Sequence, residues 1–238
     1  MLVAYGSQYQ RDKGKEPPRY DFEAPERMFE APPGEARPVK APPAKPVPAK
    51  PARAPATTEI VAIGISTGGP NALREVFSRI DPNLGRPVVV VQHMPAGFTE
   101  EFAASLDRIC PLEVKEAADG DILKPGRVLI APGDWHVVVE KRSLAGVVRV
   151  NQEPAENGHR PSADVLFRSV AKEYGNKALA VIMTGMGKDG AKELGSIYRE
   201  GGLTLGQDEA TSVVYGMPKV AYEMGHVMEQ VPDRKSVG

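Results

Sequence analysis

The stretch Ile60–Ile65 has the sequence IVAIGI, an apolar and largely β-branched run that is typical of a strand buried on both faces. A segment with apolar residues at helical spacing, 71–80, follows it directly. Two further runs, PVVVVQ at 87–92 and ALAVIM at 178–183, are also followed by helical patterns. Strands that alternate with helices in this way indicate a mostly parallel sheet covered on both faces. We therefore predict an α/β fold with three layers, αβα, and a doubly wound sheet.

Weaker patterns supply the remaining elements of this prediction. Residues 135–140 and 145–150 are separated by polar residues and predict a β-hairpin. We expect additional strands at 128–131 and 203–205 and additional helices at 98–109, 161–174, 190–200 and 218–224.

The composition of the chain changes near residue 57. Twelve of its 23 prolines lie within residues 17–55, and residues 40–55 read KAPPAKPVPAKPARAP. Such a segment has too little apolar surface to offset its chain entropy, and proline favours extended, solvated geometry. We predict a disordered tail or interdomain linker at 1–57 and one folded domain at 58–238. The alternative for residues 22–29, which contain two phenylalanines and a methionine, is a short docking segment.

Charge and composition exclude several classes of protein. Lysine plus arginine number 30 and aspartate plus glutamate 31, whereas proteins that bind nucleic acids usually carry a basic excess. No apolar run approaches the ~20 residues needed to span a bilayer, and the N-terminus lacks a signal-peptide core. The single cysteine, Cys110, excludes an intramolecular disulfide, and we interpret it as a buried structural thiol. We expect a soluble, cytoplasmic protein that is not inserted in a membrane.

Three of the predicted buried strands are followed by residues whose side chains are suited to catalysis. Ser66 follows the first strand within a G-x-S-x-G pattern, His93 follows the second, and Asp189 follows the third. In a parallel sheet, sites form beyond the carboxyl ends of the strands, and neighbouring strands lie about 4.8 Å apart. A serine nucleophile, a histidine base and an orienting carboxylate are the residue types of a hydrolytic triad.

Each of these residues also has a purely structural interpretation. Ser66 is able to cap the helix that follows it, and Asp189 is suited to the N-cap of the helix at 190–200. A single histidine at a strand end, as at His93, is structural at least as often as catalytic. The argument for a site therefore rests on all three residue types occurring together.

The other histidines are weaker candidates. His136 lies in a turn into the hairpin and is interpreted as structural or as part of the rim of the site. His159 and Arg160 precede a predicted helix and are interpreted as loop anchors, and His226 as incidental. The histidines are scattered, without the spacing of a metal site, so we predict no bound metal.

Several stretches in combination resemble the chemotaxis protein-glutamate methylesterase family, CheB. They are IVAIGISTGGP at 60–70, VQHMPAGF at 91–98, IAPG at 130–133, HRPSAD at 159–164, MTGMGKDG at 183–190 and DEATSVVYGMP at 208–218. The resemblance extends over residues 58–233 and follows the family's order.

The resemblance implies a catalytic triad of Ser66, His93 and Asp189, in an order that differs from that of α/β-hydrolases. It further implies that the backbone amide of Met186 contributes to an oxyanion hole and that Thr67 supports Ser66 by hydrogen bonding. The implied reaction removes methyl esters from glutamates of methyl-accepting chemotaxis receptors, on their cytoplasmic helices, through an acyl-enzyme. The family also deamidates receptor glutamines, and the reaction needs no metal or organic cofactor.

One departure from the family pattern concerns regulation. Family members commonly carry an N-terminal phosphoacceptor receiver domain, and the Pro-rich residues 1–57 are too few to form one. We expect either a fragment that begins in the interdomain linker or a stand-alone enzyme. A receiver domain or a chemotaxis kinase is accordingly an expected partner only in the full system.

Two other functions remain as alternatives. A dinucleotide-binding module requires Gly where this chain has Ser66, and an acidic residue where the second strand ends in Gln92 and His93. A non-catalytic receptor-docking module would retain the fold, and it predicts loss of triad residues that are present here.

Overall fold

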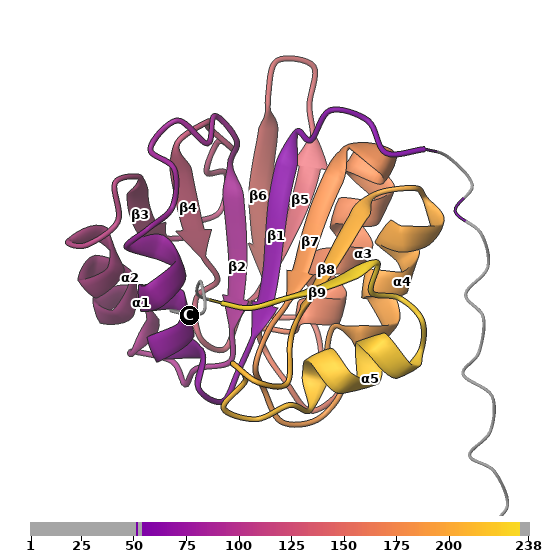
Figure 1. The fold of residues 1–238 in the computed structure, drawn as a ribbon. Helices are drawn as coiled ribbons and strands as arrows, with labels where there is room; N and C mark the ends of the chain where they lie inside the picture. The colour runs from indigo at the N-terminus through magenta and orange to yellow at the C-terminus, as the bar shows by residue number, and fades with distance from the viewer. Residues whose placement is uncertain (1–50, 52–53, 234–238) are drawn as a thin grey trace, which may run out of the picture. The chain divides into compact units, whose positions relative to one another are not determined.

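The computed structural model describes residue 51 and residues 54–233, all of which belong to the same compact unit of the chain. Within these residues, seven strands form one parallel sheet in the order β3-β4-β2-β1-β7-β8-β9 (Figure 1). The strands are β1 (Ile60–Ile65), β2 (Val88–Gln92), β3 (Glu113–Glu116), β4 (Arg127–Ile130), β7 (Ala178–Ile182), β8 (Leu203–Gln207) and β9 (Glu229–Val231). The prediction of a mostly parallel α/β sheet is confirmed.

Alternate residues of the central strands enter two separate cores, one on each face of the sheet. On one face, Val61 and Ile63 of β1 pack with helices α1 and α2; on the other, Ile60 and Ala62 pack with α3, α4 and α5. These helices are α1 (Gly69–Phe77), α2 (Thr99–Asp107), α3 (Ala163–Tyr174), α4 (Ala191–Arg199) and α5 (Met217–Glu223). A strand buried on both faces needs apolar residues at every position, which explains the continuous IVAIGI run. The three-layer arrangement is therefore also confirmed.

A two-stranded antiparallel hairpin lies outside the main sheet, as predicted. It consists of β5 (His136–Lys141) and β6 (Gly146–Asn151) and contributes Val137, Val139 and Val148 to the same core as α3. The hairpin is joined to α3 by a hydrogen bond from the Val139 amide to the Ser169 hydroxyl, at 3.0 Å.

Two strands were not predicted from the sequence, because neither is an apolar run. β3 reads EVKE and buries only one residue, Val114, at one edge of the sheet, and β9 has three residues at the other edge. Edge strands are commonly short and charged, since such features discourage pairing with other chains. Cys110 is half-buried against the α1–α2 core, where burial raises the pKa of its thiol.

The order of the strands reverses at β1. β2, β4 and β3 lie in that order on one side of β1, whereas β7, β8 and β9 lie on the other side (Figure 1). The connections on the two sides pass over opposite faces of the sheet, so the carboxyl end of β1 is a topological switch point, where ligand sites form in open α/β sheets. Ser66 is the first residue after β1, at this point.

Candidate active site

Backbone hydrogen bonds join the loops that follow β1, β2 and β7. Ile65 pairs with Gln92 in the register of β1 and β2, so Ser66 and His93 are the next residues on adjacent strands. The His93 amide donates to the Ile65 carbonyl at 3.1 Å, and the Ser66 amide donates to the Thr184 carbonyl, just beyond β7, at 2.9 Å. The three strand ends therefore converge, as the sequence pattern predicts.

The carboxylate of Asp189 forms a hydrogen-bonded pair with His93. Nε2 of His93 lies 2.8 Å from Oδ2 of Asp189, whose side chain has no solvent exposure. A carboxylate in this position fixes the imidazole tautomer with its proton on Nε2, which leaves the lone pair on Nδ1. That Nδ1 atom is buried and has no hydrogen-bond partner among the residues that the structure describes.

Four further donors hold Asp189 in its charged form. Its carboxylate accepts hydrogen bonds from the Ser162 hydroxyl (2.6 Å), the Ala163 amide (2.6 Å), the Asn157 side-chain amide (3.0 Å) and the Asp164 amide (3.4 Å). Burial raises the pKa of Asp189, but the bonds from His93, Ser162, Ala163 and Asn157 outweigh it and lower the pKa to about 2. The residue is therefore an anion at neutral pH.

Asp189 also stabilises a helix, although not the one that the sequence suggested. The N-cap of α4 is Gly190, in the left-handed region (φ 84°) and without a side-chain capping bond. Asp189 instead accepts hydrogen bonds from the first two backbone amides of α3. Its negative charge therefore lies at the positive end of that helix dipole. In return, Asp164 of α3 accepts the Glu193 amide in the first turn of α4, at 2.9 Å. The two helix starts thus cap each other.

Ser66 is half-buried, and its side chain lies against the loop after β7. A Cβ atom added to Gly185 would lie only 2.8 Å from the Cβ of Ser66, so the close approach of this loop requires glycine. Within the part of the chain that the structure describes, the Ser66 hydroxyl makes no hydrogen bond. Two adjacent strands, β1 and β2, are therefore followed by residues with an unpaired side-chain atom: the hydroxyl of Ser66 and Nδ1 of His93.

Known proteins share this arrangement of sequence and fold. Residues 61–236 match the sequence model of a family described as CheB methylesterase. The chain belongs to the CheB methylesterase family.

Relatives in this family share a large part of the chain. The protein-glutamate methylesterase/protein-glutamine glutaminase of Treponema denticola is 68% identical to this chain, over 75% of this chain and 48% of its own length. The protein of the same description from Treponema pallidum is 59% identical, over 75% of this chain and 44% of its own length. This chain therefore spans about half the length of those relatives. The crystal structure of the Thermotoga maritima CheB methylesterase catalytic domain is 41% identical, with a TM-score of 0.73, over 76% of this chain and 95% of that domain.

Of the two supporting residues implied by the CheB resemblance, Thr67 directly follows Ser66, and Met186 directly follows Gly185, which lies against Ser66. Met186 is 68% exposed, directly after Gly185, and Gly187 follows it in the left-handed region (φ 89°). Thr67 is exposed, and its carbonyl accepts a hydrogen bond from the Thr184 hydroxyl at 2.9 Å. Among the described residues, Thr67 makes no hydrogen bond to the side chain of Ser66. The roles of Met186 and Thr67 stay predictions.

The remaining histidines of this CheB-family chain differ in their relation to the site. His136 is fully buried, accepts the Ser162 amide on Nδ1 and contacts the Pro154 carbonyl through Nε2, both at 3.2 Å, which agrees with a structural role. His226 contacts the Ala191 carbonyl at 2.8 Å. His159, interpreted from the sequence as a loop anchor, stacks on His93.

Arg160 does anchor its loop. Its guanidinium donates to the carboxylate of Asp134 at 2.7 and 3.0 Å and to the carbonyls of Gln152 and Glu153 at 3.2 Å. Together with His93 and His159 it lines a shallow pocket of about 230 Å³ beside the site.

Sequence reasoning missed Asn157, Ser162 and Asp164 as parts of the site. All three contact Asp189 from the segment before and at the start of α3. The available signals were an Asn-Gly pair at 157–158, typical of a tight turn, and a Ser-x-Asp pattern at a helix start. Neither pattern states which distant residue the side chains will contact.

Proposed function

We propose that this chain is a serine hydrolase that removes methyl esters from glutamate side chains of methyl-accepting chemotaxis receptors. The observation that carries the proposal is the unpaired Nδ1 of His93, whose Nε2 is held by the buried Asp189, on a residue that ends the strand next to that of Ser66. Membership of the CheB methylesterase family supports the substrate class.

In the proposed mechanism, Nδ1 of His93 takes the proton of Ser66 as its oxygen attacks the ester carbonyl. The tetrahedral intermediate collapses when His93 returns this proton to the leaving oxygen, and methanol departs. A water molecule, deprotonated by His93, then attacks the acyl-enzyme and releases the glutamate carboxylate. Asp189 stabilises the transient imidazolium, and its low pKa keeps it charged throughout.

The same acyl-enzyme accounts for glutamine deamidation, in which ammonia replaces methanol as the leaving group. Met186 would donate its backbone amide to the oxyanion, because it follows Gly185, which lies against Ser66. Thr67 would support Ser66 from the turn before α1. No step requires a metal or an organic cofactor.

The rim of the site suits an amphipathic receptor helix. Phe98, Met186 and Val213, from three different loops, are each at least 60% exposed. They follow the carboxyl ends of β2, β7 and β8, the edge of the sheet at which Ser66 lies. We propose that the partners are the cytoplasmic helices of the receptors and, in the full system, a receiver domain or a chemotaxis kinase.

We further propose that the protein acts in the cytoplasm, where those helices lie. None of the helices in the described residues is both long and apolar enough to cross a bilayer. The catalytic domain would comprise residues 58–238, with a Pro-rich tail or linker at 1–57; the tail lies outside the described residues except for residues 51 and 54–57.

The test is methanol release from receptor membranes that carry labelled methyl esters. The chain should release methanol, Ser66→Ala should release less than a thousandth as much, and Ser78→Ala should match the parent. Ser78 is a suitable control because its side chain is exposed and, within the described part of the chain, donates a hydrogen bond only to the Glu75 carbonyl of the preceding helix. Release by Ser66→Ala at the parental rate would contradict the proposal.

A further inference from the structure

A tight turn between β6 and α3, at residues 156–159, places the side chain of His159 against His93, the candidate base. Glu156 and His159 exchange two backbone hydrogen bonds, at 3.1 and 2.9 Å, around Asn157 (φ 54°) and Gly158 (φ 79°). Two central residues with positive φ define a type I′ turn, for which Asn-Gly is a favoured sequence. The turn is therefore rigid by its own backbone chemistry.

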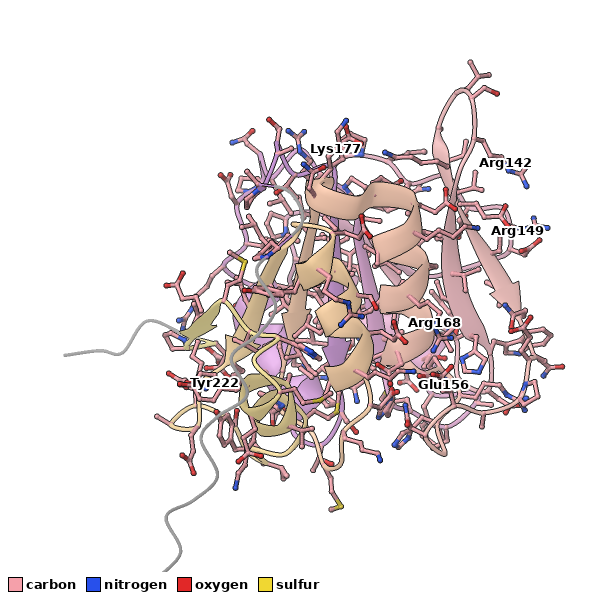
Figure 2. The ribbon with its side chains drawn as sticks, turned by 90° about the vertical axis from the view of Figure 1, so that its right-hand side faces the viewer. Arg142, Arg149, Glu156, Arg168, Lys177 and Tyr222 are labelled. Carbon is pink, nitrogen blue, oxygen red and sulfur yellow. The ribbon has the colours of Figure 1, made fainter. Side chains whose placement is uncertain are left out.

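Two contacts fix this turn to the rest of the domain. The Glu156 carboxylate pairs with the Arg168 guanidinium of α3, with one bond of 3.0 Å, and Figure 2 shows these labelled residues close together. The Asn157 amide bridges the carboxylates of Asp164 (2.7 Å) and Asp189 (3.0 Å). The position of the turn is thus tied to the Asp189 carboxylate itself.

The last residue of the turn, His159, lies flat on His93. The ring centroids are 3.9 Å apart, and the planes are inclined by 9°. The single hydrogen bond to Asp189 fixes the Nε2 atom of His93 but leaves rotation of the ring about that bond. The terminal torsion of a histidine is intrinsically broad, so the bond alone does not define the direction of Nδ1.

We propose that His159 is a positioning residue, whose stacked ring holds the plane of His93 so that Nδ1 faces Ser66. The inference rests on the proposed function, because it assigns His93 as the base. It adds a residue that acts through His93 and does not touch the reacting atoms.

The electrostatic surroundings agree with a neutral stacking partner. Burial lowers the pKa of His159, and the charge of His93 lowers it by a smaller amount. The negative charge of Asp189 opposes this shift. The charged side chains around the turn, Glu156 and Arg160, are engaged with Arg168 and Asp134. A neutral ring does not oppose the positive charge that His93 acquires during the reaction.

Two substitutions separate stacking from other roles. His159→Phe keeps a flat ring, whereas His159→Leu keeps apolar bulk without one. We expect His159→Phe to retain kcat within about threefold, and His159→Leu to lower kcat by about 10- to 100-fold with little change in KM, since small misplacements of a catalytic group have effects of this size. Thermal melting of both variants reports whether they fold, and His159→Gln, which has no ring, replaces His159→Leu if the latter unfolds.

A spectroscopic readout tests the same inference without any receptor. The downfield proton resonance of the His93 Nε2–H group bonded to Asp189 should be sharp in the parent and His159→Phe and broadened or lost in His159→Leu. If the parent releases no methanol, the proposed substrate is wrong, and this resonance still decides the role of His159. Parental kcat and resonance in His159→Leu, an equal loss in His159→Phe, or an effect confined to KM would each overturn the inference.

Discussion

Asp189 combines two tasks at the scale of a single residue, since it binds the His93 imidazole and also caps helix α3. Its pKa of about 2 lies below the ordinary value of 3.8, so the folded state favours the charged form. The stabilisation is therefore fully present above pH ~4 and is lost as the pH falls toward 2.

We predict that Asp189→Asn lowers the free energy of unfolding by about 2 kcal/mol at pH 7, from the size of the pKa shift. The deficit relative to the parent should shrink below pH ~4, where the parental carboxylate loses its advantage. Urea unfolding between pH 7 and pH 3 measures both quantities.

Asp81→Asn serves as the control, because Asp81 is exposed and, among the described residues, its carboxylate accepts a hydrogen bond from the nearby Asn83 amide alone. Its effect should stay within about 0.5 kcal/mol. A deficit for Asp189→Asn that is independent of pH would contradict the assigned cause.

The three candidate triad residues were predictable because strand ends are visible in sequence. Each follows a short apolar run, and parallel strands place their carboxyl ends at one edge. The stacking of His159 and the bridging by Asn157 were not predictable, because they depend on where the turn at 156–159 lies against two distant loops. Sequence spacing contains no signal for that placement.

At the scale of elements, the position of α3 against β1 controls the site, since α3 and its N-cap residue Ser162 together supply three of the donors to Asp189. Gly64 of β1 lets this helix approach: an added Cβ would lie 2.8 Å from the Cβ of Ala163 and 3.1 Å from the Phe167 ring. Both neighbours are fully buried and have little room to move.

We predict that Gly64→Ala destabilises the protein by about 1–3 kcal/mol, the usual effect of overpacking a core. It should also lower turnover, because a shift of Ala163 away from Gly64 would lengthen the hydrogen bond from the Ala163 amide to Asp189. Thermal melting and methanol release test the two effects.

Gly206→Ala is the matched control, since Gly206 is also a buried strand glycine. An added Cβ there meets the side chain of Val227, with the methyl groups at 3.1 Å, and no atom of α3, because Gly206 lies two strands away from Gly64. The prediction for Gly64 fails if both variants lose the same stability and turnover.

Sequence periodicity predicts the helices of this fold better than its edge strands. The helices on both faces were predicted to within a few residues, because their buried faces recur with helical spacing. β3 and β9 were missed because edge strands need not be apolar, and here they are charged or very short.

At the scale of the whole molecule, the contacts that build the site all lie within residues 64–217. We predict that a shortened chain beginning at Ala54 keeps the melting temperature and the methanol release of the 238-residue chain. Ala54 is the starting point because its carbonyl accepts a hydrogen bond from Asn176, beside the start of β7. A loss of more than half of the activity would show that residues 1–53 contribute to catalysis.

The central claim is that Ser66 is a nucleophile activated by His93, and covalent labelling tests it most directly. The chain is treated with a fluorophosphonate, which phosphonylates activated serines, and the modified peptide is mapped by mass spectrometry. We predict one adduct, on Ser66, formed at least 100-fold more slowly in His93→Ala, the typical contribution of a general base being about 10²–10⁴. An adduct on another serine, or labelling of Ser66 at the parental rate in His93→Ala, would contradict the account.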